Sequence, residues 1–526
     1  MSCPGESTAR LGRESAQRPP SVSSASQAGG VPRATNSTNR CTFWLLQLVS
    51  RLLWLAVRVT AAVKPIRRPE RVIFAAGDIF AGGGSSLLAV MYLIFLTDVV
   101  HIQPWLAGTA IFVAKLWDAV NDPLMGALSD RIRTRFGRRR PFIFAGSLLL
   151  VPVMALLWLP WVPVDGQVAM AIWAALSLIV YNSVQTMLAV PYASFSTEIA
   201  TSYAERNKVN TLRLLFSSVS SAVSTLAASA LFGAYRSGGM PLTEWYAITV
   251  LGFGLVYATP MLVLAIVCRE RTPVPETNPK LTPRTFVQPL QTPIFRRLLG
   301  MYIAQALAWD VVSATILYYT LYVLPGSNSQ VFLGTFIAVN VIAYPIVSQL
   351  VKRIDKRRIY ATLIPLAMVG IIGVAFYPAD WPMAGAYAIG AAVAIGMAGA
   401  QLMPWVMFPD VLDAAQLQNG RRDAGSYGAL MTFLRGIGSA IVVWLIGQVL
   451  SATGYLTPEG NEVIAQPESV QWGIRWVMFV GVAGFMAAGW WLSRKYSLGL
   501  TEALAQQQEL ERRAAADDTV SAPSEA

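Results

Sequence analysis

Long apolar segments recur from about residue 72 onward, and they restrict the chain to an integral membrane fold. A span needs roughly 20 apolar residues. Only 13% of the residues are charged, against about 25% in a soluble domain. In a bilayer each backbone polar group must be paired within its own segment, so the expected fold class is all-α. Twelve spans are predicted, at 72–96, 106–129, 141–160, 168–196, 209–234, 246–268, 297–323, 331–351, 358–377, 384–408, 425–451 and 471–492.

The distribution of basic residues between these segments predicts their orientation. Four loops, "TDVVHIQPW", "WVPVDGQ", "LPGSNSQ" and "YPADWPM", contain no Lys or Arg. The loop after the second span carries six arginines between Arg131 and Arg140, and the loop after the eighth runs from Lys352 to Arg358 with five basic residues. Basic loops remain in the cytoplasm. Both termini are therefore expected there.

A polar, proline-rich break at 269–296 divides the chain into two comparable halves. Six spans lie on each side, and a basic loop follows the second span of each half. Two repeated bundles around a central site would produce this pattern. The predicted units are six-helix bundles at 71–268 and 297–495, a cytoplasmic central loop at 269–296 and a cytoplasmic tail at 496–526.

Residues 1–70 are expected to form a basic extension that precedes the bundles. Its first forty residues are rich in Ser, Arg, Pro and Ala, a composition typical of disorder. A transit peptide or an over-long gene model would have a similar composition. In the segment 43–63, Gln47, Arg51 and Arg58 share one helical face, which predicts a helix lying in the membrane interface.

The residue types that build metal, catalytic and nucleic-acid sites are scarce or dispersed. Cys3, Cys41 and Cys268 have no disulfide or metal spacing, and His101 is the single histidine. The net charge of +12 is spread over short loops, so nucleic acid is not an expected partner. The chain contains no HExxH or GxSxG pattern. We therefore expect neither an enzyme nor a resident cofactor or metal; the expected partners are the lipid bilayer, a small-molecule substrate and a monovalent cation, bound by a monomer.

Two carboxylates stand in the middle of the second apolar segment. Asp118 and Asp122 are four residues apart, so a helix places both on one face. Two bare carboxylates in an apolar bundle repel each other and lose their hydration, and a Na⁺ or a proton between them removes both penalties. Asn121 or a water would add an oxygen ligand. Salt bridges are the alternative, for example with Lys115, which otherwise tunes the cation site.

One arginine in each half is a candidate for substrate binding or for coupling. Arg213 lies in the fifth apolar segment and Arg435 in the eleventh. Each could bind an anionic or polyhydroxyl substrate through its planar array of N–H groups, or could balance the charge of Asp118 and Asp122. For Arg435 we expect competition with the cation for these acids, which would couple the two fluxes.

Two further acids occupy comparable places at the start of each half. Asp78 lies in the first span and Asp310 in the seventh. Trp309, next to Asp310, could stack on a sugar or a lipid headgroup. The alternative is a tryptophan at the lipid interface beside a solvated carboxylate.

Five blocks in order resemble the glycoside–pentoside–hexuronide:cation symporters of the major facilitator superfamily. They are "GD" at 77–78 with "LTDVV" at 96–100, "WDAVNDPLMG" at 117–126 with "SDRIRTRFGRRRPFI" at 129–143, "VPYASF" at 190–195, "LMPWVMFPDVLDAAQLQNGRRDAGSYG" at 402–428, and "QPES" at 466–469. The resemblance covers about 72–495. It implies the major facilitator superfamily fold, with twelve transmembrane helices in two six-helix bundles that work by alternating access.

The resemblance also implies roles for individual residues. In melibiose permeases the two acids of the second helix hold the coupling H⁺, Na⁺ or Li⁺, and these match Asp118 and Asp122. Arg435 stands where the family more often has a lysine. Arg213 matches the arginine of the sugar site, and Asp78 belongs to the family's "GD" block.

Two departures put a galactoside specificity of the melibiose type in doubt. The sugar-binding aspartate of the first helix falls at Gly82, and the aspartate of the fourth helix falls at Ala189. The sodium-dependent lysolipid symporters of vertebrates share the "DP" and "LPW..LPDV.D" blocks that this chain resembles, and they also lack both acids.

Charged residues at the ends of the second and tenth spans are predicted to form a cytoplasmic gate. The loop after the second span resembles a longer variant of the superfamily's characteristic loop. Its acid and arginines would bond helix ends in the outward-open state and release them in the other. Positive-inside topology is the alternative, but it needs no acids. The residues are Asp130, Arg131, Arg138, Arg139 and Arg140 in the first half and Asp410, Asp413 and Arg422 in the second.

Together these features predict a secondary active transporter that couples Na⁺ or H⁺ to the symport of a small polar solute. A sugar or glycoside is the expected cargo. A sodium-dependent lysolipid or amphiphile symporter is the alternative, favoured by Gly82 and Ala189. A non-transporting membrane sensor would need neither the paired acids nor the gate residues. The expected location is the plasma or inner membrane, as a multi-pass protein.

Overall fold

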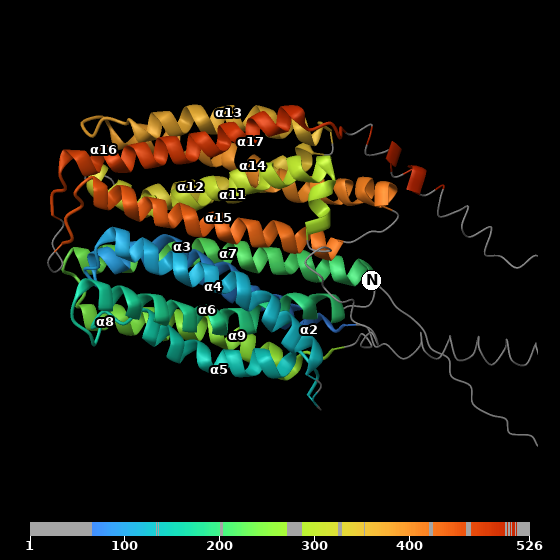
Figure 1. Cartoon of the computed structure of the whole chain (residues 1–526), viewed down its shortest axis with the longest axis horizontal. Helices are drawn as coiled ribbons and strands as arrows, with labels where there is room; N and C mark the ends of the chain where they lie inside the picture. Colours follow the sequence, from blue (N-terminus) through green and yellow to red (C-terminus); the bar gives the residue numbers. More distant parts are fainter. Residues whose placement is uncertain are drawn as a thin grey trace, which may run out of the picture. The chain divides into compact units, whose positions relative to one another are not determined.

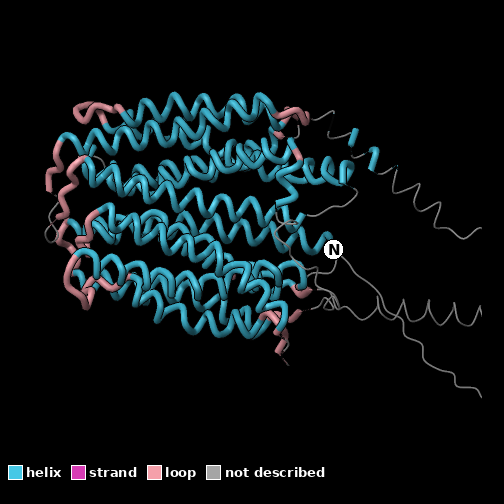
Figure 2. Tube along the Cα trace, in the orientation of Figure 1, coloured by secondary structure: helices cyan, strands magenta, loops and turns pink. Residues whose placement is uncertain are grey.

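The computed structural model describes most of the chain from residue 66 onward and is almost entirely helical (Figures 1 and 2). The described residues are 66–499 except 133, 135, 200–202, 271–286, 325–328, 352, 420–423 and 459–463, together with 502, 505–506, 508–510 and 512. The interfacial helix predicted at 43–63 lies outside them. Within these residues, each of the twelve predicted spans is helical.

The first half contains the elements up to Val267. They are α2 (Arg68–Ala76), α3 (Asp78–Asp98), α4 (Pro104–Arg131), α5 (Arg140–Leu157), α6 (Gln167–Glu198), α7 (Tyr203–Arg236), α8 (Leu242–Ala247), the π-helix η1 (Ile248–Phe253) and α9 (Gly254–Val267).

The second half begins with a short 3₁₀ turn before its first long helix. Its elements are η2 (Gln288–Gln291), α11 (Pro293–Tyr318), the π-helix η3 (Tyr319–Val323), α12 (Ser329–Leu350), α13 (Lys356–Ala375), α14 (Met383–Asn419), α15 (Ala424–Ala452), α16 (Glu468–Trp476), the π-helix η4 (Val477–Ala483) and α17 (Gly484–Lys495).

The helices differ most from the predicted spans at their polar ends. The tenth span was predicted to end at residue 408, but α14 continues to Asn419. The fifth was predicted from 209, but α7 begins at Tyr203. Hydropathy marks where a helix leaves the hydrocarbon layer, whereas the backbone hydrogen bonds of a helix continue into polar sequence. The charged turns that bear the predicted gate residues are therefore helical.

Ten helices of the described chain are long and apolar enough to cross a membrane. α4 is not among them, because Lys115, Asp118 and Asp122 lower its hydropathy. It is nevertheless 28 residues long and packs along α6 and α15. α4 thus packs against one helix of each half, while part of its surface, including Asp122, is exposed.

Contacts within each half and between the halves position the central site. In the first half α3 packs on α7 and α4 on α6; in the second, α13 and α12 pack on α14, and α11 packs on α17. Between the halves, α4 packs on α15, α3 on α11, and α7 on α12. Figure 1 shows α8 and α16 at one end of the helices and α2 at the other. We call these the α8–α16 end and the α2 end.

Candidate functional site

Asp118 and Asp122 face α6, and each accepts a hydrogen bond from it. Asn182 Nδ2 donates to Asp118 Oδ2 at 3.0 Å, and Thr186 Oγ1 donates to Asp122 Oδ1 at 2.8 Å. The acids are four residues apart on α4 and their donors are four apart on α6, so the two helices run parallel with matched faces. Asp118 Oδ1 is buried and has no hydrogen-bond partner among the described residues. A buried acceptor left in this way is costly, and a cation or proton would remove that cost.

Two neighbours of the acids on α4 were also predicted to belong to the site. Asn121 is 7% exposed, and its Nδ2 makes no hydrogen bond with the described residues. Lys115 Nζ donates to Ser439 Oγ of α15 at 2.7 Å. Its ammonium lies within electrostatic range of Asp118 and Asp310 but makes no ion pair with the described residues. Lys115 therefore connects the two halves instead of closing a salt bridge with the acid one turn away.

Asp310 and Arg435 form an ion pair inside the second half. Arg435 Nη2 lies 3.3 Å from Asp310 Oδ1. The second oxygen, Asp310 Oδ2, is buried without a partner among the described residues. The structure thus differs from the expectation that Arg435 contacts the α4 acids, because a carboxylate of its own half is nearer. The ring of Trp309 lies 5.7 Å from that of Phe336, so this tryptophan is part of an aromatic wall.

Asp78 and Arg213 form a second ion pair, inside the first half. Arg213 Nε lies 2.5 Å from Asp78 Oδ2, and Tyr192 Oη donates to the same oxygen at 2.8 Å. The guanidinium carbon of Arg213 stands 4.5 Å from the centre of the Tyr192 ring. Arg213 therefore neutralises the charge of Asp78. The expectation that it balances the charge of the α4 acids is not met.

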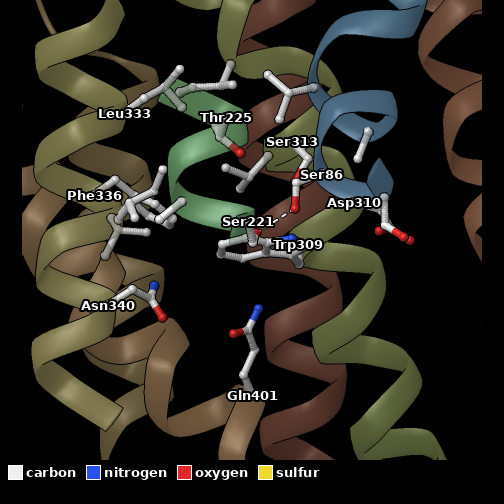
Figure 3. A pocket seen from close by; sticks show the side chains of 18 of the residues that line it. Ser86, Ser221, Thr225, Trp309, Asp310, Ser313, Leu333, Phe336, Asn340 and Gln401 are labelled. Carbon is white, nitrogen blue, oxygen red and sulfur yellow. Dashed lines mark hydrogen bonds between the residues drawn. The ribbon is translucent and has the colours of Figure 1, made fainter. Parts of the chain in front are cut away.

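A cavity of about 390 Å³ lies between the two halves (Figure 3). Small-molecule sites typically measure about 300–1,000 Å³. The wall from α3 and α7 is made of small and hydroxyl residues, and Ser86 and Ser221 hydrogen-bond at 2.5 Å. The wall from α11 and α12 is largely apolar, with Trp309 and Phe336. Asp310 lies on the opposite side of the cavity from Phe336 in Figure 3.

The charges in the centre of the bundle do not balance. Asp118, Asp122 and Asp310 supply three carboxylates, while Lys115 and Arg435 supply two positive charges. Asp78 and Arg213 neutralise each other. When all five side chains are ionised, the count leaves one negative charge among these residues. No group of three or more His, Cys, Asp or Glu that could hold a metal ion occurs in the described part of the chain.

Comparisons with known proteins agree with this architecture. The family model described as MFS/sugar transport protein, where MFS is the major facilitator superfamily, matches residues 73–499. The chain belongs to this family.

Relatives in the family carry different kinds of cargo according to their names. The glucuronide carrier protein homolog of Escherichia coli is 24% identical over 78% of this chain and 89% of its own length. The sodium-dependent lysophosphatidylcholine symporter 1 of Gallus gallus is 22% identical over 83% of this chain and 89% of its own. A bacterial homologue of the lysosomal transporter Spinster has the same fold, with a TM-score of 0.61, 14% identity and coverage of 82% of this chain and 98% of that one. The predicted major facilitator fold is confirmed, and the relatives are transporters, not enzymes.

The packing of α3 on α7 gives a reason for one departure within the family. A Cβ atom at Gly82 would lie 2.2 Å from the carbonyl oxygen of Ser217. Real Cβ atoms do not approach backbone so closely, so an aspartate at this position would force α3 and α7 apart. Gly82 lines the cavity, and the backbone carbonyl and hydroxyl groups of Ser217 occupy the place where a side chain at this position would begin.

Three of the predicted gate residues of this transporter, Asp130, Arg138 and Arg139, meet at the α2 end around an acid that was not predicted. Arg139 lies 2.5 Å from Asp130 and 3.3 Å from Glu198, and it donates to Ser129 at 2.6 Å. Arg138 also pairs with Glu198 and lies 3.8 Å from Asp130. Because Glu198 is the last residue of α6, this network joins the ends of α4 and α6 to the start of α5.

The remaining predicted gate residues of the first half have separate roles. Arg140 donates to the carbonyl oxygens of Ala265 at 2.7 Å and Ile266 at 2.6 Å, and so caps the last turn of α9. Glu270, just beyond α9, accepts the backbone N–H groups of Arg138 and Arg139 at 3.0 and 2.7 Å. Arg131 is exposed, and its side chain makes no hydrogen bond or ion pair with the described residues.

In the second half, Asp410 pairs with a lysine that the sequence did not single out as a gate residue. Lys356 Nζ, at the start of α13, lies 2.6 Å from Asp410 Oδ2 and 3.3 Å from the carbonyl oxygen of Val406. Asp413 lies one turn further along α14, within electrostatic range of Asp410. Arg422 lies outside the described residues. By their order in the chain, α13 and α14 are the third and fourth spans of the second half, so this pair corresponds to the start of α5 and the end of α6 in the first half.

The residues of other helices that contact the predicted site residues were not identified from the sequence. Asn182 and Thr186 were available as a signal, because two polar residues four apart in an apolar span match the spacing of Asp118 and Asp122. Glu198 carried a weaker signal, as an acid at the end of a span. Nothing in the sequence indicated that Ser439 would meet Lys115.

Proposed function

We propose that this protein is a cation-coupled symporter that carries a small polar solute by alternating access between its two halves. The observation that carries the proposal is the central charge imbalance of three carboxylates against two cationic side chains. A single bound monovalent cation restores neutrality. Ionisable residues inside a membrane bundle mark ion and substrate pathways.

Asp118 and Asp122 are the proposed ligands of this cation. The free oxygen Asp118 Oδ1 supplies one ligand, while Asn182 holds Asp118 Oδ2 and Thr186 holds Asp122 Oδ1 in place. Carboxylate and amide oxygens suit a hard cation such as Na⁺, and Asn121 is near enough in sequence to add its amide oxygen. Protonation of one carboxylate would balance the charge equally, so H⁺ is the second candidate for the coupling ion.

The cavity between the halves is the proposed substrate site. Its serine-rich wall offers hydroxyl groups to a polyhydroxyl solute, and the Trp309–Phe336 wall offers an apolar face. Asp310 and Arg435 lie at the cavity with polar atoms for an oriented contact. A sugar or glycoside, the cargo type in the name of the glucuronide relative, combines these features.

A lysolipid or related amphiphile is the second candidate for the cargo. The observation that favours it is the extent of the apolar wall, which α12 continues through Phe332, Leu333 and Ile337. An acyl chain would bury there without needing hydrogen bonds. The lysophosphatidylcholine symporter among the relatives has this kind of substrate by name.

The orientation follows from the basic loops. The described basic residues Arg131, Arg138 to Arg140 and Arg353 to Arg358 lie at the α2 end, and basic loops stay in the cytoplasm. We place the α2 end in the cytoplasm and the α8–α16 end on the opposite side of a plasma or inner membrane, with the protein as a monomer.

Gradient-driven uptake into proteoliposomes tests the proposal. Labelled glycosides, glucuronides and lysophosphatidylcholine are offered in parallel, each with an inward Na⁺ gradient, an inward H⁺ gradient or none. We expect one solute class to enter faster with one gradient, and Asp118→Asn and Asp122→Asn to abolish that stimulation. Asp165→Asn, an exposed carboxylate in the loop before α6, is the matched control. Uptake of every solute at a rate independent of both gradients would refute symport.

A further inference from the structure

A buried polar cluster at the α8–α16 end is not used by the cation site, the cavity or the predicted gate. Its centre is Asp98, the last residue of α3, which is 0% exposed. Asp98 Oδ1 accepts hydrogen bonds from Tyr455 at 2.6 Å and Thr97 at 2.7 Å. Asp98 Oδ2 accepts from Arg236 at 3.3 Å and from Tyr322. The carboxylate thus receives four donors.

The donors come from both halves of the transporter. Thr97 and Arg236 belong to the first half, on α3 and at the end of α7. Tyr322 lies in η3, and Tyr455 follows α15, so both belong to the second half. A further bond of 2.7 Å joins Thr97 to Tyr318 of α11. Hydrogen bonds from two phenols of the second half therefore end on one carboxylate of the first.

The backbones of the two halves also touch at this end. A Cβ atom at Gly447 of α15 would lie 2.4 Å from the carbonyl oxygen of Pro104, and one at Gly108 would lie 3.2 Å from that of Trp444. α4 and α15 can approach so closely only because both positions lack a side chain. The cluster around Asp98 and this helix crossing together close the α8–α16 end.

The ion pair of Asp98 lies within one half, whereas its hydrogen bonds with the tyrosines cross between the halves. This arrangement is typical of a reversible latch and not of a permanent link. The charge of Asp98 is balanced by Arg236 within its own half, and this ion pair can stay intact when the halves separate. Only the phenol hydrogen bonds must break. Water can replace those donors on the exposed carboxylate, whereas an ion pair split between the halves would leave two unpaired charges. Opening is therefore possible without a stranded buried charge.

We propose that Asp98, Tyr322 and Tyr455 form the latch that closes the α8–α16 end in one state of the transport cycle. The inference rests on the proposed function, because that function defines the two states as open to opposite sides of the membrane. Its test requires no substrate and no ion gradient. It can therefore fail while symport is confirmed, or hold if the cargo is misassigned.

The test measures the access of a thiol reagent to the cavity from each side of the membrane. Ser85→Cys, at a cavity-lining position of α3, is labelled with a membrane-impermeant maleimide in a chain whose three native cysteines are replaced by serine. Tyr322→Phe with Tyr455→Phe removes only the phenol hydroxyls. The two substitutions remove three hydrogen bonds between the halves, those from Tyr455 and Tyr322 to Asp98 and the bond of 2.9 Å from Arg236 to the Tyr322 hydroxyl. At a net contribution of about 0.5 kcal/mol each, their loss corresponds to about a tenfold shift in the populations of the two states. We expect labelling from the α8–α16 side to rise about tenfold and labelling from the α2 side to fall.

The control is Tyr257→Phe, since Tyr257 is buried and its hydroxyl donates to Ser224 within the first half at 2.7 Å. It should leave both labelling rates unchanged. Labelling rates of the double variant equal to those of the parent, or a rise from both sides at once, would overturn the latch. The first result means that the bonds do not hold the end closed, and the second means that the bundle has only loosened.

Discussion

Asp310 and Arg435 are ion-paired across 3.3 Å between α11 and α15, inside one half of the transporter. The pairing leaves the α4 acids without this arginine as a partner. In the proposed symport, coupling between cation and substrate would therefore run through the shared electric field of these charges and not through competition for one guanidinium. Lys115, bonded to Ser439 one turn from Arg435, is the side chain that links the two sets of charges.

Removing the carboxylate of this pair should weaken substrate binding. In Asp310→Asn the guanidinium of Arg435 loses its neutralising partner at the edge of the cavity, and a substrate donor loses its acceptor at Oδ2. Hydrogen bonds to charged groups contribute about 1.5–3 kcal/mol, so KM for uptake should rise about tenfold or more. The double variant Asp310→Asn/Arg435→Gln restores the charge balance and should recover part of the loss. Additive losses in the double variant would show that the two residues act independently.

The donors on α6 should set the affinity for the coupling cation. Thr186→Val removes the hydroxyl that fixes Asp122, and Asn182→Ala removes the amide that fixes Asp118. Each carboxylate then loses its orientation, and the cation concentration for half-maximal uptake should rise about tenfold. Titration of uptake with Na⁺ and with H⁺ at fixed substrate measures the effect. Ser183→Ala is the control, because the Ser183 hydroxyl donates to the carbonyl oxygen of Ile179 and not to an acid. An equal effect of this variant would exclude a specific role for the donors.

The pair of Asp78 and Arg213 should contribute to stability. Asp78 is 6% exposed, and its removal leaves the charge of Arg213 largely buried beside Tyr192. Breaking one partner of a buried ion pair costs about 3–5 kcal/mol. Asp78→Asn should therefore lower the midpoint of thermal unfolding in detergent. Tyr192→Phe, which removes one hydrogen bond to the same carboxylate, should cost about 1 kcal/mol. If Tyr192→Phe lowered the unfolding midpoint as much as Asp78→Asn, the ion pair would not be the main contribution of Asp78 to stability.

The network at the α2 end should control turnover more than affinity. Arg139 bonds Asp130, Ser129 and Glu198 at once, so Arg139→Gln should reduce kcat for uptake while KM stays within about twofold, since no substrate contact is lost. Glu198→Gln should act in the same direction. Arg131→Gln changes an exposed arginine of the same segment and should have little effect. A rise in KM with an unchanged kcat would count against a gating role for Arg139.

The sequence predicted the elements of this fold because membrane spans are encoded locally. An apolar stretch such as 141–160 must be helical to pair its own backbone, and α5 occupies Arg140–Leu157. The i, i+4 spacing of Asp118 and Asp122 likewise fixed their common face of α4. What hydropathy could not show were the polar helix ends, since α14 continues to Asn419.

By itself, then, the sequence determined the helical spans, the division into halves and the charges that must be neutralised inside the bundle. The tertiary structure decided which charge meets which. Arg213 joins Asp78 across 135 positions of the chain and Arg435 joins Asp310 across 125, and Asp98 meets Tyr455 across 357. Helix periodicity specifies on which face of its helix a charged residue lies and how deep in the membrane, but several acids of this chain share a similar position. The partner is selected by which helices pack together, and that choice depends on the shapes of whole helix surfaces.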